Sequence, residues 1–219
     1  MCYNRYGDIM ASSIIHVAVA NELNKKLNVD RNQLLIGSIA PDISKQIGET
    51  KNMSHFLDYG NSIPNLERFL LKYEDRLNDP FVLGYYIHLI TDYFWFKYFI
   101  PEVYDENFVM TKLDGTTVKC TGQMFQLYIY NDYTNMNAKL IEKYDLNIDF
   151  LYDCIPDIAD IIEEIPIERI HVIIDKIREI VETSKVRKDF IFDMANIEKF
   201  IQTSVDLISA DLERLGIIS

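Results

Sequence analysis

The stretch from Asp79 to Ile100, DPFVLGYYIHLITDYFWFKYFI, constrains the fold more than any other part of the sequence. Asp79 followed by Pro80 predicts a helix start, because the carboxylate can cap free backbone N–H groups and proline at the first helical position loses no hydrogen bond. The side chains that follow are apolar on nearly every side of the helix. Such a helix is typical of the centre of a domain, with other helices packed around it.

Two polar residues, His88 and Asp92, interrupt this apolar helix four positions apart. Residues with this spacing project from one face, about one turn from each other. A neutral imidazole and a carboxylate so placed can hold a metal ion together. They can also form a hydrogen bond that satisfies two buried polar groups, and taken alone the pair favours that simpler interpretation.

The composition favours a single all-α domain over residues 1–219. Hydrophobic residues make up 48% of the chain, and 219 residues can enclose a large core. Only 8 Gly and 6 Pro are present, so the turn signals of a sandwich or barrel are few. We expect a helical core over 10–100, a loop or small hairpin over 101–120 and further helices over 121–219, after a loosely ordered leader over 1–9.

Caps, prolines and apolar periodicity predict the individual elements. Asp114 and Gly115 form the best hairpin signal, within residues 108–120. The other helices are expected from Ser12 or Ser13 to about 27, over 33–40 where Pro41 ends the helix, from 61–64 to about 77, and over 122–144, 150–162, 167–181 and 197–215.

Charge and cysteine content exclude several classes of partner and site. A net charge of −12 argues against binding to a nucleic acid duplex, which requires many Lys and Arg residues. A small anionic substrate is still compatible, provided that a bound cation reverses the local field. The three cysteines, Cys2, Cys120 and Cys154, lie far apart and predict neither a disulfide framework nor a thiolate zinc site.

We expect no transmembrane segment and a cytoplasmic location. The central stretch approaches the length of a membrane span, but ionisable residues interrupt it. The apolar run Ile14–Ala20 contains His16 and lacks the basic region and cleavage pattern of a signal peptide. No pattern in the sequence determines the oligomeric state.

Three more polar residues lie in apolar surroundings in the first half of the chain. His16 is inside the run 14–20, Asp42 follows Pro41 at a helix end, and His55 precedes Phe56 and Leu57. A single Pro-Asp is more often a turn carboxylate than a ligand. Together with the central pair, however, these residues form a set of nitrogen and oxygen ligands without thiolate, which suits Zn²⁺, Fe²⁺ or Mn²⁺.

The second half offers weaker candidates. His171 and Asp175 repeat the spacing of the central pair, but Asp175 falls toward the polar edge of its helix, so a structural role is favoured. Asp132 is a polar residue among tyrosines.

In their order and context, four segments resemble the zinc-dependent phospholipase C family, which shares its fold with the single-strand-specific zinc nucleases. The resemblance covers about residues 10–100. The segments are HVAVA from His16, GSIAPD from Gly37 to Asp42, SHF around His55, and GYYIHLITD from Gly84 to Asp92.

The resemblance implies a phosphoester hydrolase that acts on a small phosphoester or a lipid headgroup. Asp42, His55, His88 and Asp92 would surround one metal ion, and Asp92 would bridge to another ion that His16 also holds. Asp42 or Asp92 would orient the attacking water, as a general base or through a hydrogen bond. Tyrosines such as Tyr85, Tyr86 and Tyr130 are expected to line the pocket.

The sequence also departs from the family. The enzymes carry a further histidine and a His-x3-Glu motif for an additional zinc ion, for which Asp132 and the His171–Asp175 pair are the only candidates here. The secreted enzymes also use an N-terminal amine freed by removal of a signal peptide. One or two zinc ions are therefore expected, with iron or manganese as alternatives.

Two other functions remain open. One is a non-catalytic helical protein that binds a partner and keeps a structural or vestigial metal site. The other is a His-Asp phosphohydrolase, which the absence of an adjacent His-Asp dipeptide disfavours.

Overall fold

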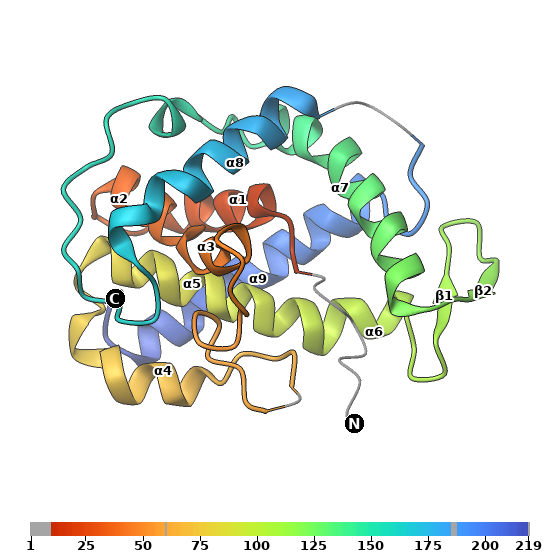
Figure 1. Ribbon diagram of the computed structural model, residues 1–219, viewed down its shortest axis with the longest axis horizontal. Helices are drawn as coiled ribbons and strands as arrows, with labels where there is room; N and C mark the ends of the chain where they lie inside the picture. The colour runs from red at the N-terminus through yellow and green to blue at the C-terminus, as the bar shows by residue number, and fades with distance from the viewer. Residues whose placement is uncertain (1–9, 60, 185–187, 219) are drawn as a thin grey trace.

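The computed structural model describes residues 10–59, 61–184 and 188–218, and it confirms an all-α fold with one small β-hairpin (Figure 1). The leader expected over residues 1–9 lies outside the described part, as does Cys2. The helices are α1 (Ser13–Asn24), α2 (Arg31–Gly37), α3 (Ile43–Gln46), α4 (Leu66–Tyr73), α5 (Pro80–Phe94), α6 (Ile100–Val103), α7 (Gly122–Lys143), α8 (Ile170–Thr183) and α9 (Met194–Arg214).

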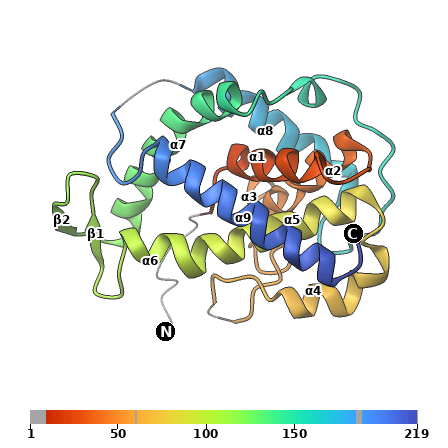
Figure 2. The same ribbon diagram turned by 180° about the vertical axis from the view of Figure 1, so that it is seen from behind.

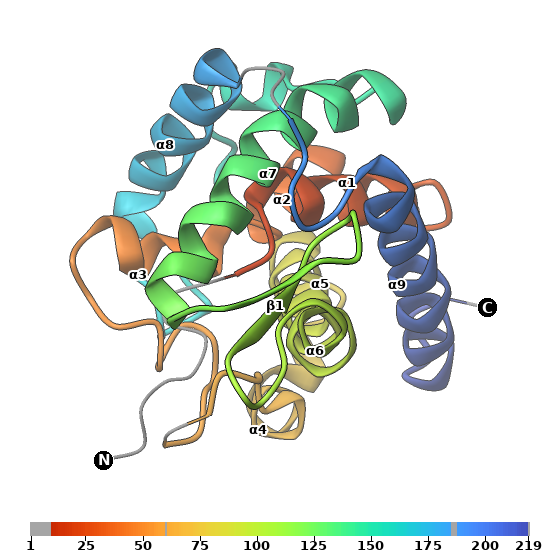
Figure 3. The same ribbon diagram turned by 90° about the vertical axis from the view of Figure 1, so that its right-hand side faces the viewer.

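Helix α5 lies at the centre, as its sequence predicts. The Asp79 side chain caps it by accepting hydrogen bonds from the N–H groups of Phe81 and Val82. Every residue from Phe81 to Asp92 is buried. Figures 2 and 3 show α1, α4 and α9 on different sides of α5. The polar side chains of α5 therefore face protein rather than water.

The helix continues beyond its expected end at Ile100. Residues Trp95–Phe99 form a π-helical turn, and α6 then extends to Val103. In a regular α-helix the ring of Pro101 would clash with the carbonyl group of Lys97, four residues earlier. The wider π turn, in which carbonyl groups pair five residues ahead, relieves that clash. The helix thus continues through Pro101 into the residues 101–120 that were expected to form a loop or small hairpin.

Two glycines let α2 and α5 pack backbone against backbone. A Cβ atom on Gly84 would lie 2.1 Å from the Leu34 carbonyl oxygen, and one on Gly37 would lie 2.2 Å from that of Phe81. Both distances are far shorter than any van der Waals contact, so only glycine allows this approach. The close packing places the C-terminal end of α2 directly beside the polar face of α5.

Helix α2 ends at Gly37, three residues before the expected boundary at Ala40. The chain then forms a 3-10 turn over Ala40–Asp42 that runs into α3. Pro41 has no N–H to donate to the carbonyl group of Gly37, so the α-helical hydrogen-bond pattern is interrupted between the two helices. This turn places Asp42 inside the protein, where the residue is 3% exposed.

The hairpin is confirmed: β1 (Val109–Thr111) pairs antiparallel with β2 (Thr117–Lys119), with Gly115 in the turn at a φ angle of +80°. The helix expected over 150–162 is wrong. Only a 3-10 turn at Asp149–Leu151 forms there, because Pro156 and the surrounding aspartates interrupt any apolar stripe. The helix expected from 61–64 begins at Leu66, where Asn65 provides the cap.

Among the described residues, no helix is both long and apolar enough to cross a membrane. Cys120 and Cys154 are free thiols.

Candidate metal centre

The five residues predicted from the first hundred positions converge on one buried site. His16 comes from α1, Asp42 from the turn before α3, His55 from the loop before α4, and His88 and Asp92 from α5. Their exposed fractions lie between 0 and 3%. Such burial of five ionisable side chains requires strong compensating interactions.

The ring of His88 is oriented by a carbonyl group at the end of α2. Its Nδ1 lies 2.8 Å from the Ser38 carbonyl oxygen, which can only accept, so Nδ1 carries the hydrogen. The neutral ring then offers a lone pair at Nε2. A metal-ligating histidine in proteins is held in the same way, by a second hydrogen bond on its other nitrogen.

His55 is oriented by its neighbour Ser54. The Ser54 hydroxyl donates to the Lys51 carbonyl oxygen at 3.4 Å, so it can accept from His55 Nδ1 at 3.0 Å. The next residue, Phe56, adopts a φ angle of 53°, a left-handed conformation that costs roughly 1 kcal/mol or more in a non-glycine residue. Its buried ring packs edge-on against Phe69, which holds this loop in place.

The Nε2 atoms of His55 and His88 face each other at 3.2 Å. In the tautomers with the hydrogen on both Nδ1 atoms, each of these nitrogens presents a lone pair to the other. Two lone pairs at this distance repel unless a proton or a metal ion lies between them. The pair is therefore arranged to share a cation.

Two carboxylate oxygens complete a cage around this point. Asp42 Oδ1 lies 3.5 Å from His55 Nε2, and Asp92 Oδ2 lies 3.7 Å from His55 Nε2 and 3.6 Å from His88 Nε2. Two ligands of a tetrahedral zinc ion lie about 3.4 Å apart when each bond is about 2.1 Å long. Asp42, His55 and His88 form one group that could hold a metal ion, and Asp92 lies at its edge, close to both histidines.

The other oxygen of Asp92 points toward His16. Its Oδ1 lies 3.4 Å from His16 Nε2 and accepts a hydrogen bond from the Ala11 backbone N–H at 3.3 Å. The rings of His16 and His88 stack with their centroids 3.8 Å apart. His16, His88 and Asp92 form a second group that could hold a metal ion.

The pattern of unsatisfied atoms fits a metal centre. Within the described residues, four buried atoms of this site lack a hydrogen-bond partner: both ring nitrogens of His16, Asp42 Oδ1 and Asp92 Oδ2. An unsatisfied buried polar atom costs roughly 1–3 kcal/mol, so a cluster of four needs an explanation. The two carboxylate oxygens are the same atoms that complete the cage.

The local electrostatics keep most ligands in the protonation state that a metal ion requires. Burial, reinforced by His88, lowers the pKa of His16, and burial also lowers that of His55. Burial would raise the pKa of Asp92, but His16 and His88 outweigh it and hold the pKa well below 3.8. Neutral imidazoles and ionised carboxylates are the metal-binding forms.

The pKa values of Asp42 and His88 are also shifted by their neighbours in the site. Burial would raise the pKa of Asp42, but the nearby His55 and the charge of His88 outweigh it and lower the pKa. His88 is the exception among the histidines, because the carboxylates Asp92 and Asp42 outweigh burial and raise its pKa. The raised pKa makes His88 the imidazole of the site that takes up a proton most readily.

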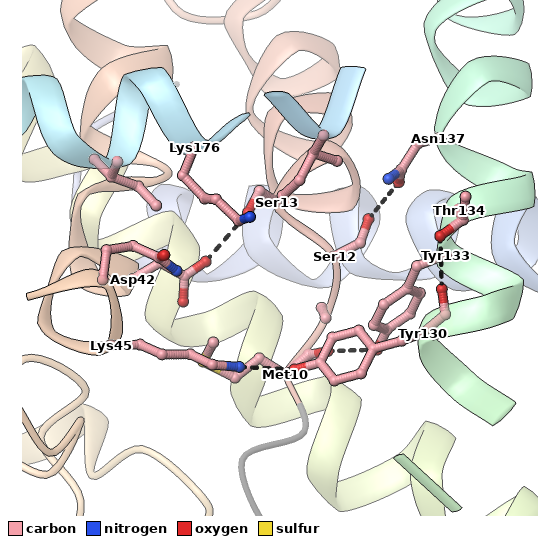
Figure 4. A pocket seen from close by; sticks show the side chains of 14 residues that line it. Met10, Ser12, Ser13, Asp42, Lys45, Tyr130, Tyr133, Thr134, Asn137 and Lys176 are labelled. Atoms are coloured by element: carbon pink, nitrogen blue, oxygen red, sulfur yellow. Dashed lines mark hydrogen bonds between the residues drawn. The ribbon is translucent and has the colours of Figure 1, made fainter. Parts of the chain in front are cut away.

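A cavity of about 280 Å³ adjoins the centre (Figure 4). Asp42 belongs to both, since it lines the cavity while its Oδ1 faces His55. Its Oδ2 accepts a hydrogen bond from the Ser13 hydroxyl at 3.3 Å. Tyr130 lines the cavity as expected, but Tyr85 and Tyr86 do not. They lie on other faces of α5, where their hydroxyl groups bind the Ser54 carbonyl oxygen and Asp211.

The candidate ligands from the second half of the chain do not lie at the metal centre. Asp132 is buried, but its two oxygens accept hydrogen bonds from the backbone N–H groups of residues 190–192. His171 is exposed, and Asp175 pairs with Arg178 at 2.8 Å. Within the described residues, the groups able to hold a metal ion consist only of the five predicted side chains.

Comparisons with family models, with curated proteins and with solved structures found no match.

Proposed function

We propose that this chain is a metal-dependent hydrolase of phosphoesters, similar to the phospholipases C that bind zinc. The observation that carries the proposal is the buried group of Asp42, His55 and His88, with Asp92 close to both histidines, beside a cavity that Asp42 lines. A ligand cage supports metal binding, and an adjoining cavity gives a substrate access to it. The choice of phosphoesters rests on the resemblance of the sequence to that family.

The donor set supports zinc, held as one or two ions. Three imidazoles and two carboxylates without thiolate also suit iron or manganese. The first ion would be held by Asp42, His55 and His88, with Asp92 beside it. A second would lie between His16 and Asp92, whose two oxygens point to the two groups.

A divalent ion in this centre would lower the pKa of a coordinated water and place positive charge near the phosphoryl oxygens of the substrate. The side chains provide orientation. Asp42 is the carboxylate that lines the cavity, so it is better placed than Asp92 to hold a water against an entering phosphoester. The Ser13 hydroxyl, bonded to Asp42 Oδ2, holds the carboxylate in this orientation.

One observation favours a non-catalytic alternative. The described residues contain no separate set of ligands for the additional zinc ion that the family uses. A protein that keeps only a structural metal ion and binds a partner would look the same at this site.

Hydrolysis of bis(4-nitrophenyl) phosphate by protein reconstituted with zinc, iron or manganese tests the proposal. We expect turnover that is lost with Asp42→Asn and retained with Asp175→Asn, since Asp175 lies outside the site. Asp42→Asn keeps one oxygen ligand, so metal content is measured in parallel to separate lost binding from lost chemistry. A metal-loaded protein that hydrolyses this ester under none of the three conditions contradicts the enzymatic function and leaves the structural alternative.

A further inference from the structure

The cavity beside the metal centre is lined by two lysines from two neighbouring helices. Lys45 reaches it from α3, and Lys176 reaches it from α8, while α7 and the residues before α1 form the remaining walls (Figure 4). The segments that supply the two lysines are far apart in the sequence. The cavity thus has a positively charged component that the metal ligands do not provide.

Lys45 is coupled to the metal centre by its position. It follows Asp42 by three residues, a spacing that places both side chains on the same side of the turn. Its Nζ donates a hydrogen bond to the Tyr130 hydroxyl at 2.8 Å across the cavity. The bond holds the ammonium group of this exposed residue beside the cavity.

Lys176 has an acidic partner that it can exchange. Its Nζ lies 2.8 Å from Glu179 Oε2, but the two side chains are 39% and 60% exposed. An ion pair with this exposure contributes little to stability, so a charged ligand can replace Glu179 at little cost.

The charge of the cavity is opposite to that of the protein. The chain carries a net charge of −12, yet the cavity lining includes the two lysines and no carboxylate other than the candidate ligand Asp42. A concave region lined by one sign of charge concentrates ligands of the opposite sign. A bound metal ion would neutralise Asp42 and strengthen this effect.

We propose that Lys45 and Lys176 bind a second anionic group on the substrate, beyond the phosphate that is hydrolysed. The proposal rests on the proposed function for the identity of the hydrolysed group. A diester phosphate carries one negative charge, which the metal centre would neutralise, so the two lysines remain available for a further anionic group. The cavity volume, close to the lower limit of about 300 Å³ for small-molecule sites, suits a phosphorylated headgroup or a soluble bisphosphate.

Binding of a matched pair of ligands tests this proposal independently of turnover. The metal-loaded protein is titrated calorimetrically with thymidine 5′-monophosphate and with thymidine 3′,5′-bisphosphate. We expect about tenfold tighter binding of the bisphosphate, the effect of a single charge-assisted hydrogen bond at a partly exposed site. The preference falls to near unity in the double variant Lys45→Gln/Lys176→Gln and declines with added salt.

Lys25→Gln is the matched control, because Lys25 pairs with Glu22 in the same i, i+3 geometry and does not line the cavity. It retains the preference. Equal binding of the two ligands by the wild-type protein, or a preference that survives in the double variant, overturns the proposal. Metal content and melting temperature of each variant show that the centre and the fold are intact.

A second experiment separates this proposal from the proposed function. It measures hydrolysis of thymidine 5′-(4-nitrophenyl phosphate), a phosphodiester, with and without an additional 3′-phosphate. If neither ester is hydrolysed, the enzymatic function fails while the binding comparison still decides the role of the lysines. Vesicles of phosphatidylcholine with and without phosphatidylinositol 4-phosphate identify the source of the anion. Selective binding to the phosphorylated vesicles supports a lipid headgroup, and binding of the soluble bisphosphate alone supports a soluble substrate.

Discussion

The imidazole rings of His16 and His88 lie face to face, with centroids 3.8 Å apart and planes inclined by 11°. One ring comes from α1 and the other from α5, and neither is exposed to solvent. Two stacked imidazoles cannot both be protonated without strong repulsion. Since Asp92 directs one oxygen to each ring, the arrangement is suited to two metal positions that share a carboxylate.

The two positions can be separated by removing His16. We expect His16→Ala to lose the ion held by His16 and Asp92 while keeping the ion in the cage of Asp42, His55, His88 and Asp92. Metal content measured by elemental analysis would then fall from two ions to one per chain. If the wild-type protein holds only one ion and His16→Ala loses it, the prediction is wrong, because the occupied position is then the one at His16.

Chelation should lower the stability of the fold. Removing the metal ions leaves at least four buried polar atoms unsatisfied, each at a cost of roughly 1–3 kcal/mol. A destabilisation of 1 kcal/mol lowers the melting temperature by about 2–4 °C in a domain of this size. Calorimetry before and after dialysis against chelator should show this decrease, and zinc should restore the original value. An unchanged melting curve after proven metal removal would count against a buried metal centre.

Gly84→Ala should disrupt both the fold and the site. The new methyl group would lie 2.1 Å from the Leu34 carbonyl oxygen, so α2 and α5 would have to separate. Overpacking of this kind costs about 1–3 kcal/mol, more than the roughly 1 kcal/mol that alanine gains in helix propensity. We expect a lower urea midpoint and weaker metal retention, because α2 carries the Ser38 carbonyl that orients His88.

Gly48→Ala is the control for this effect. Gly48 has a φ angle of +79° and no neighbour that an added Cβ would meet. This variant should lose about 1 kcal/mol through local backbone strain alone and keep its metal ions. Equal metal loss in the two variants would show that the close helix packing does not support the site.

Asp132→Asn should destabilise the protein without affecting the metal centre. The carboxylate accepts hydrogen bonds from the backbone N–H groups of Phe190, Ile191 and Phe192, at 2.7 to 3.3 Å. An amide can replace only one of its oxygens, and each lost bond to a charged group costs roughly 1.5–3 kcal/mol. The exposed Asp175→Asn should change the free energy of unfolding by less than about 0.5 kcal/mol. Metal loss in Asp132→Asn with the fold intact would place Asp132 in the metal centre after all.

Much of the centre could be predicted because its ligands lie on strongly patterned segments. The capped apolar stretch after Asp79 predicted the buried helix, and the four-residue spacing of His88 and Asp92 placed both on one face of it. His16, Asp42 and His55 were recognisable as polar residues within apolar surroundings. Their convergence depends on the approach of α2 to α5, for which the glycines are the only local signal.

The parts that sequence analysis missed depend on tertiary contacts. Lys45 could have been noticed from its spacing to Asp42, but Lys176 reaches the cavity only because α8 packs beside α3. Tyr85 and Tyr86 were misplaced because an all-round apolar helix gives no indication of which face meets the cavity. The helix expected over 150–162 failed because burial of Phe150 and Leu151 does not require helical structure.

The central claim, that these five side chains hold metal ions, is tested most directly by metal stoichiometry. Wild-type protein, His88→Ala and Asp92→Ala are saturated with zinc, freed of excess ion by gel filtration and subjected to elemental analysis, with circular dichroism to confirm the helical fold. We predict one or two zinc ions per wild-type chain and essentially none in folded Asp92→Ala or His88→Ala. A wild-type protein that retains no zinc, iron or manganese, or variants that retain as much as the wild type, would contradict the claim.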